Sequence, residues 1–212
     1  MPLRRLTQRW AVAGAGIVKR GLDVLGGGAA LLLLSPILIA AAVLVRLDGG
    51  PVIFAQTRVG RHGRVFKMFK FRSMRTDAEK RLAELLAANK HEGGVTFKIK
   101  NDPRVTRIGR WLRRYSIDEL PQFYNVLIGD MSLVGPRPPV PREVELYTLA
   151  DRRRLFVKPG ITCIWQISGR AEIDFPGQVL LDVGYIESQS LGKDIKILAG
   201  TPKAIVFGPG AY

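Results

Sequence analysis

The sequence predicts a membrane-attached α/β protein that is mostly helical around a small sheet. Three observations support this fold class: an uncharged apolar run from Val24 to Val45, two strand-like segments at 51–56 and 65–71, and several stretches whose apolar residues recur at helical spacing. The chain has 212 residues, of which 47 % are apolar, so it can bury a core and is not a disordered polycation. The sequence shows no internal repeat and no second domain boundary.

The basic residues are concentrated in the N-terminal third. The chain has 33 Lys and Arg against 18 Asp and Glu, a net charge of +15, and residues 1–75 alone contain 13 basic and 2 acidic residues, or +11. Such a region needs an anionic partner: nucleic acid, lipid headgroups or a phosphorylated substrate. The single Cys163 excludes an intramolecular disulfide, and the isolated His62 and His91 exclude a Cys/His zinc site.

The uncharged run has the length of a membrane helix. As a straight helix its 22 residues would extend about 33 Å, enough to cross the hydrocarbon core of a bilayer. The run is also longer than the apolar part of a signal peptide. We therefore expect a membrane segment rather than a cleaved leader.

Both flanks of this run are strongly basic, although positive charge favours the cytoplasmic side. A helix that bends inside the membrane and returns puts both flanks on that side. Ser35-Pro36 lies at the middle of the run, where proline breaks the helical hydrogen bonding and Ser35 can bond a freed carbonyl. We expect a re-entrant helix, with a kinked spanning helix as the alternative.

The segments 51–56 and 65–71 are expected to form two strands around a turn, and a helix over about 77–90 follows a capping box. A second helix is expected over 105–115. It combines an arginine face with an apolar stripe made of Ile108, Trp111, Leu112 and Tyr115. That pattern suits either a membrane surface or a helix docked on the protein's own core, and both interpretations remain open.

Four prolines make 133–141 a rigid loop. The remaining expectations are a helix near 141–150, a buried strand over 161–167, and two short amphipathic pieces near 191–199 and 202–207, separated by Gly200 and Pro202.

The most informative stretch contains the adjacent carboxylates Asp118 and Glu119. Ser116 and Glu119 have the spacing of a capping box, which would place Asp118 in the first turn of a helix, where the helix dipole favours its ionised form. Such an anion can act as a nucleophile, and Mg²⁺ is the natural cation beside two carboxylates and a phosphate. Arg113 and Arg114 stand just upstream, where they could hold phosphate oxygens. The alternative is an ordinary capped helix with acidic residues in its first turn.

Other polar candidates are weaker when taken alone. Lys70 and Arg72 alternate along the second strand and could face one phosphate site, and Arg137 is held on a stiff loop between Pro136 and Pro138. Arg170 and Asp182 are further candidates without an assigned role. The sequence has no P-loop, and no Gly-rich dinucleotide fingerprint opens an expected helix after a strand.

Four long stretches together resemble a known family. They are KRGLDVLGGGAALLLLSPILIAA, PVIFAQTRVGRHGRVFKMFKFRSM, RIGRWLRRYSIDELPQFYNVLIGDMSLVGPRP and KPGITCIWQISGR, and the chain resembles the bacterial monotopic phosphoglycosyl transferases from about Lys19 to its end. The resemblance implies three parts: a basic N-terminal segment over 1–21, a re-entrant membrane helix over 22–47 broken at Ser35 and Pro36, and a catalytic domain over 48–212. That domain would lie on the cytoplasmic face of the bacterial inner membrane.

The resemblance also implies a reaction. Asp118 would attack the β-phosphate of a UDP-sugar, release UMP and carry a phosphosugar, which polyprenyl phosphate would then accept in the first membrane step of exopolysaccharide or glycoconjugate assembly. Glu119 would hold Mg²⁺, Arg113 matches a family arginine, and the PRP sequence at Pro136, Arg137 and Pro138 matches a motif linked to the uridine nucleotide. Membrane lipid is an expected partner, nucleic acid is not, and a homodimer is compatible with this assignment.

Two features depart from the family. The stretch from Tyr185 to Asp194 lacks the tryptophans that members often have there, and Cys163 stands where glycine is common. The rival interpretation is a non-catalytic basic membrane adaptor that binds anionic lipid or nucleic acid. It explains the charge of the N-terminal third but gives no reason for the SIDELP and GPRP sequences.

Overall fold

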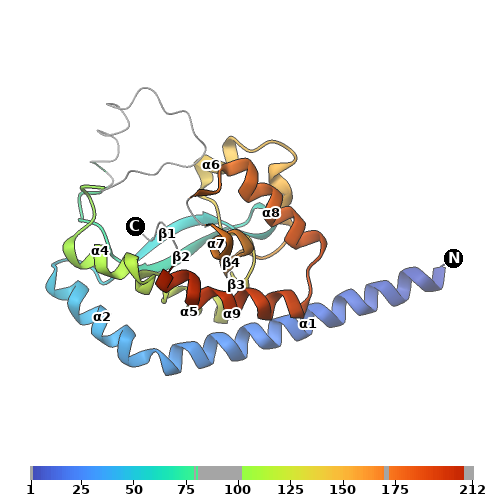
Figure 1. Cartoon of the computed structure of the whole chain (residues 1–212), viewed down its shortest axis with the longest axis horizontal. Helices are drawn as coiled ribbons and strands as arrows, with labels where there is room; N and C mark the ends of the chain where they lie inside the picture. Colours follow the sequence, from blue (N-terminus) through green and yellow to red (C-terminus); the bar gives the residue numbers. More distant parts are fainter. Residues whose placement is uncertain (1, 79, 81–101, 170–171, 208–212) are drawn as a thin grey trace.

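The computed structural model describes the backbone of residues 2–78, 80, 102–169 and 172–207, with side chains from residue 16 onward. Two long helices, α1 (Pro2–Leu33) and α2 (Ser35–Leu47), form an open V along one side of the molecule, and the other elements gather above them (Figure 1). The described part is mostly helical with small sheets, which confirms the mostly helical α/β part of the predicted fold class. Its strands, however, form two sheets rather than one.

The break between α1 and α2 falls at the predicted position. The two helices meet at an angle of 62°, and neither alone is long and apolar enough to cross a membrane, whereas the bent pair passes that test by length and composition. Pro36 cannot donate a backbone hydrogen bond, which favours a break here. Ser35 Oγ donates to the Leu32 carbonyl over 2.7 Å, as the sequence predicted for this side chain.

The first sheet is a hairpin of β1 (Ile53–Val59) and β2 (Val65–Phe71), paired antiparallel from Ile53↔Phe71 to Val59↔Val65. This confirms the two expected strands. The connecting turn η1 (Arg61–Gly63) contains His62 and Gly63 with φ of 58° and 79°. The second sheet is a parallel pair of two very short strands, β3 (Ser132–Val134) and β4 (Gly160–Thr162).

The remaining helical elements surround these sheets. In chain order they are α4 (Arg107–Arg114), η2 (Ile117–Glu119), α5 (Gln122–Ile128), α6 (Pro141–Glu145), η3 (Asp151–Phe156), α7 (Ile164–Ser168), α8 (Phe175–Glu187) and α9 (Leu191–Phe207). Helix α4 confirms the helix expected over 105–115. The helix expected over 77–90 lies almost wholly outside the described residues.

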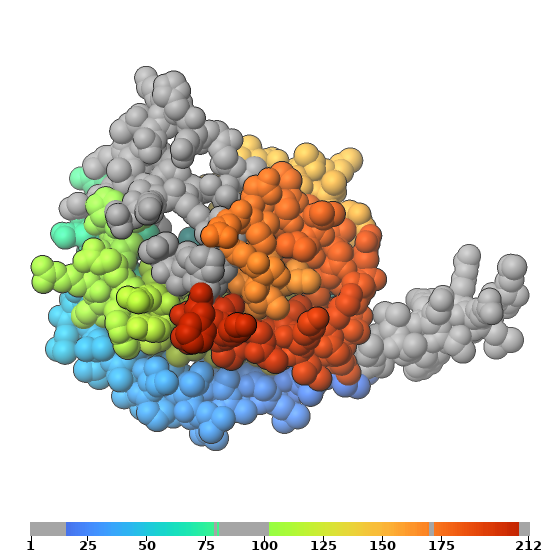
Figure 2. All heavy atoms as spheres, in the orientation of Figure 1, coloured from blue at the N-terminus to red at the C-terminus, as the bar shows by residue number. Residues whose placement is uncertain are grey.

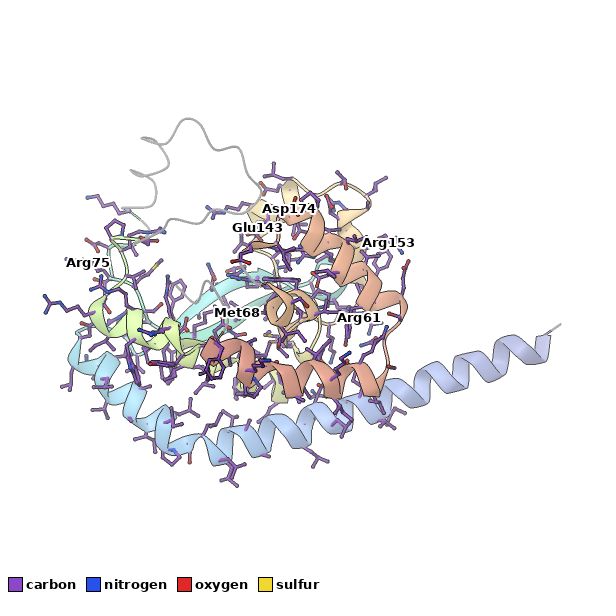
Figure 3. The ribbon with its side chains drawn as sticks, in the orientation of Figure 1. Arg61, Met68, Arg75, Glu143, Arg153 and Asp174 are labelled. Atoms are coloured by element: carbon purple, nitrogen blue, oxygen red, sulfur yellow. The ribbon has the colours of Figure 1, made fainter. Side chains whose placement is uncertain are left out.

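The main core lies between β2, α5, β3, α8 and α9. Its most buried members are Val126, Met131 and Val134, and Met68 on β2 lies in the same interior cluster (Figure 3). A second cluster, which includes Val45 and Leu112, packs α2 against α4. Figure 2 shows α1 and α2 lining the lower face of the molecule, with the C-terminal helices covering much of the face above them.

Three sequence predictions of local structure are wrong in detail. The expected strand over 161–167 ends at Thr162, and Ile164–Ser168 is helical, because a short apolar run fits either structure. The rigid loop expected over 133–141 begins one residue into β3. The helix near 141–150 stops at Glu145, because Asp151 accepts hydrogen bonds from the Thr148 backbone and hydroxyl over 2.8 and 2.7 Å and starts a new turn.

The two amphipathic pieces expected at the C-terminus form one helix, α9, that continues through Pro202. The helical turn next to Pro202 is held by two contacts of the Thr201 side chain. Thr201 Oγ1 donates to the Ile197 carbonyl and also lies 2.8 Å from Thr162 Oγ1 on β4. These contacts stabilise the helix where proline removes a backbone donor.

Candidate active site

Asp118 and Glu119 lie on a tight turn between α4 and α5. Ser116 adopts the left-handed conformation, with φ 53° and ψ 22°, and its side chain makes no cap hydrogen bond, so the predicted capping box is wrong. The carboxylates lie in the short turn η2 rather than in the first turn of a regular helix. Asp118 is only 6 % exposed, so this turn directs its side chain into the protein.

Helix α4 is docked on the backbone that follows β2. The Thr106 N–H donates to the Ser73 carbonyl over 3.1 Å, and a Cβ added at Gly109 would lie 1.9 Å from that same oxygen. Only glycine permits so close an approach. Arg113, one turn further along α4, donates from Nε to Ser73 Oγ over 2.8 Å. This contact fixes a guanidinium beside the turn that carries Asp118.

Lys70 on β2 contacts the carboxylate pair directly. Its Nζ lies 2.7 Å from Glu119 Oε1, and the two side chains are 16 % and 27 % exposed. The sequence predicted Lys70 as a phosphate-binding residue, but here its ammonium pairs with a carboxylate. The structure therefore brings together the second strand and the dyad, two segments that the sequence analysis treated as separate candidates.

The surroundings shift the pKa values of the two carboxyl groups in opposite directions. Burial opposes ionisation of Glu119, but Lys70, Arg137 and Arg58 overcome it and lower its pKa to about 2. For Asp118 burial prevails: it raises the pKa of this carboxyl, with a contribution from the charge of Glu119, against the opposing charges of Lys70 and Arg113. The expected low pKa of Asp118 is thus wrong, because desolvation outweighs any helix-end dipole at this turn.

The loop that follows β3 is fixed from two sides. Pro136 and Pro138 are buried while Arg137 between them is exposed. The Gly160 N–H donates to the Pro136 carbonyl over 2.9 Å, and Arg58 Nη1 donates to the Pro138 carbonyl over 2.8 Å. The charge of Arg137 acts on Glu119, so this loop belongs to the same electrostatic cluster as the dyad.

Arg58 is a site residue that the sequence analysis missed. Besides the Pro138 carbonyl, its guanidinium contacts Gln56 Oε1 over 2.7 and 3.0 Å. Burial and the charge of Arg137 lower its pKa to about 10. No sequence signal marked it, since an arginine on a short strand is normally solvated. Ser73, the partner of Arg113, was also missed, because a lone serine after a strand gives no signal of function.

The remaining sequence candidates make other contacts. Arg72 is buried and donates from Nη2 to the Val45 carbonyl at the end of α2, over 2.9 Å. Arg114 is exposed, with its guanidinium 5.8 Å from the ring centre of Tyr115. Asp182 forms a buried ion pair with Arg154 at 2.6 Å. Arg170 lies outside the described residues.

A metal ion that is bound together with substrate phosphates needs few ligands from the protein. Among the described residues, no group of three or more His, Cys, Asp or Glu side chains could hold a metal ion. One oxygen of Glu119 is already paired with Lys70. Mg²⁺ is often held by one or two carboxylates together with substrate phosphates, and Asp118 and Glu119 could provide that number.

Comparison with known proteins places this chain in a family. The bacterial sugar transferase family matches residues 14–208, and the chain belongs to it. The chain is 53 % identical over 196 residues to the galactosyl transferase CpsE of Streptococcus agalactiae, covering 92 % of this chain and 43 % of that protein. It is 43 % identical to the undecaprenyl-phosphate galactose phosphotransferase of Salmonella typhimurium, covering 99 % and 45 %.

A shorter relative aligns over most of its length. The exopolysaccharide production protein ExoY of Rhizobium meliloti is 42 % identical over 201 residues, which cover 93 % of this chain and 89 % of ExoY. The chain thus spans less than half of the two longer relatives but almost all of ExoY. The family assignment confirms the resemblance seen in the sequence.

Proposed function

We propose that this chain transfers a sugar 1-phosphate from a UDP-sugar to polyprenyl phosphate, with release of UMP. The observation that carries the proposal is a buried Asp118 next to an ionised Glu119, with Lys70, Arg113 and Arg137 acting on the pair. Names of relatives that contain "undecaprenyl-phosphate galactose phosphotransferase" and "undecaprenyl-phosphate glucose phosphotransferase" support the same reaction class.

The transfer proceeds in two displacements. A carboxylate oxygen of Asp118 attacks the β-phosphorus of the UDP-sugar, the bond from that phosphorus to the bridging oxygen breaks, and the electron pair leaves with UMP. A phosphate oxygen of the lipid then attacks the same phosphorus, and the bond to Asp118 breaks to restore the carboxylate. Splitting one transfer into two steps is the usual advantage of covalent catalysis.

The charges around the dyad match what each displacement needs. Phosphoryl transfer depends on positioning and on neutralising charge at the phosphate oxygens. The raised pKa of Asp118 shows that its surroundings stabilise the anion poorly, which leaves it reactive toward phosphorus. Arg113 and Lys70 supply positive charge beside the reacting group, and the rigid loop with Arg137 would hold the uridine nucleotide.

We include Mg²⁺ in this proposal as a cofactor bound mainly through Glu119. Its low pKa keeps Glu119 anionic over the whole physiological pH range, as a ligand for a hard cation must be. The ion would supply charge neutralisation at the diphosphate when bound.

The membrane attachment proposed here is a re-entrant one. Leu32 and Leu33 at the bend are 76 % and 77 % exposed, so no part of the described protein covers the tip of the V. The exposed aromatic rings of Trp111 on α4 and of Tyr115 directly after it suit the interface between lipid and water. A re-entrant helix in the bacterial inner membrane would place the catalytic domain on its cytoplasmic face, where the nucleotide sugar is.

Cysteine labelling tests this topology. Cysteines introduced at Gly14 and Gly49, on the two sides of the bent pair, should both react with a membrane-impermeant maleimide only in inside-out vesicles. Cys163 is buried and serves as a silent background. Labelling of either position in right-side-out vesicles would show that the helix spans the membrane.

Nucleotide release tests the reaction itself. Purified protein in detergent, with Mg²⁺, undecaprenyl phosphate and a panel of UDP-galactose, UDP-glucose and UDP-N-acetylgalactosamine, should release UMP from at least one donor. Asp118→Asn should abolish release, whereas Asp151→Asn, at an exposed turn, should retain it. Normal turnover by Asp118→Asn would contradict the proposal.

A further inference from the structure

Asn125 on α5 is completely buried, at 0 % exposure, and both ends of its carboxamide are bonded to β2. Its Oδ1 accepts from the Phe69 N–H over 3.0 Å, and its Nδ2 donates to the Lys67 carbonyl over 2.8 Å. Neither the chemistry of the dyad nor the predicted motifs assign this residue a role. A buried amide with two good hydrogen bonds to one strand is strongly oriented, since either bond lost would leave an unpaired polar group.

The two contacts close the second edge of β2. On its first edge β2 pairs with β1, with Phe69 opposite Ala55 and Lys67 opposite Thr57. Asn125 bonds the backbone N–H of one β2 residue and the backbone carbonyl of the residue two positions before it. A residue of an added strand can bond the same two groups. The Asn125 side chain thus makes the two hydrogen bonds that a third strand would make at this position of β2. Met68, between the two bonded residues, is buried in the core cluster that also contains Val126 (Figure 3).

Both residues of the Lys70–Glu119 ion pair lie close in sequence to the contacts between Asn125 and β2. Lys70 is the next residue along β2 after Phe69, and α5 begins at Gln122, three residues after Glu119. The carboxamide therefore bonds the strand that carries the ammonium to the helix that follows the carboxylates. A shift of β2 against α5 would move the Lys70 ammonium away from Glu119, against which it now lies at 2.7 Å.

We propose that Asn125 is a positioning residue that fixes β2 against α5, so that the Lys70 ammonium is held against the carboxylate pair. It touches neither carboxylate and acts through the strand. The role rests on the proposed function, because the carboxylates matter only if they carry the transfer. Withdrawal of the ammonium would leave Glu119 without the partner that now lies 2.7 Å from it and would remove a positive charge from beside Asp118.

The test compares the effects on kcat and on KM for UMP release. Asn125→Leu preserves the approximate volume but removes both hydrogen bonds, and Asn125→Ser, with one short hydroxyl, serves if the first variant does not fold. In either variant kcat should fall about tenfold, because the Lys70 ammonium is no longer held beside the carboxylate pair. The KM for the UDP-sugar should change little, because the nucleotide loop is held by other contacts.

A matched control separates positioning from general destabilisation. Ile197→Ala creates a cavity in the same core cluster from α9, away from the contacts that Asn125 makes. It should lower the Tm as much as an Asn125 variant or more, yet leave kcat close to the wild-type value. An Asn125 variant that folds and keeps the wild-type kcat would overturn the proposal.

A second readout does not need turnover. A double-mutant cycle of Lys70→Met and Glu119→Gln, measured by thermal unfolding, should show a coupling in the wild type that is lost in the Asn125→Leu background. If the wild type shows no transferase activity but the coupling is lost in this way, the proposed function fails and the positioning role stands. If turnover occurs and the coupling is unchanged in the Asn125→Leu background, the positioning role fails alone.

Discussion

Replacing Lys70 by methionine removes the ammonium that lies 2.7 Å from Glu119 Oε1 while keeping most of the apolar stem. The pKa of Glu119 falls from the ordinary glutamate value of 4.5 to about 2, which at 1.36 kcal/mol per pKa unit is on the order of 3 kcal/mol. Three cations share this effect and the pair is partly exposed. We therefore expect Lys70→Met to reduce the free energy of unfolding at pH 7 by about 2 kcal/mol.

The loss should depend on pH in a defined direction. Because the folded-state pKa of Glu119 is depressed, its ionisation stabilises the fold above pH 4.5. That stabilisation disappears as the pH falls from 4.5 through about 2. The difference between wild type and Lys70→Met should therefore be full at pH 7 and shrink progressively below pH 4.5 as far as the protein remains folded.

Thermal unfolding in detergent micelles measures this effect. For a chain of this size, about 2 kcal/mol corresponds to a Tm lower by about 4–8 °C. A double-mutant cycle with Glu119→Gln isolates the pair, and its coupling energy should account for most of the loss. A coupling below about 0.5 kcal/mol, the value of a weak surface pair, would refute the view that this contact sets the state of the dyad.

Three further outcomes follow from other contacts. Arg154→Met leaves the buried Asp182 carboxylate without its 2.6 Å partner and should cost about 3–5 kcal/mol in chemical denaturation, whereas a cost under about 1 kcal/mol would contradict a buried pair. Gly109→Ala puts a methyl group against the Ser73 carbonyl and should force α4 away from β2. Because this displaces the catalytic groups that α4 positions, kcat for UMP release should fall more than tenfold. Chelation with EDTA should stop UMP release but leave the Tm unchanged, and a large fall in Tm would indicate a structural metal instead.

Much of the architecture could be predicted from local sequence. The hairpin follows from two strand-like segments close in the chain, and the bend in the N-terminal helix pair follows from Ser35-Pro36. Both features depend on neighbours within a few residues. The parallel pairing of β3 with β4 could not be predicted, because each strand has three residues and the partners are about 28 positions apart.

The dyad was identified from its residues, but its electrostatic state was not. The sequence indicated a capped helix and a low pKa for Asp118, whereas Ser116 is left-handed and burial raises that pKa. Burial and the charge of Lys70 come from other parts of the chain. Spacing within a motif contains no information about either, so the sequence could locate the carboxylates without predicting the direction in which each pKa is shifted.

The direct test of the proposed chemistry is mass spectrometry of protein incubated with UDP-sugar and Mg²⁺ but without the lipid acceptor. After rapid acid quench and trypsin digestion, the peptide covering residues 115–142 contains both carboxylates of the dyad, and its fragment ions distinguish Asp118 from Glu119. The account predicts a phosphosugar on Asp118, with the mass of the sugar in the donor used, that disappears when polyprenyl phosphate is added before the quench. UMP release with an unmodified Asp118, or with the adduct on another residue, would contradict it.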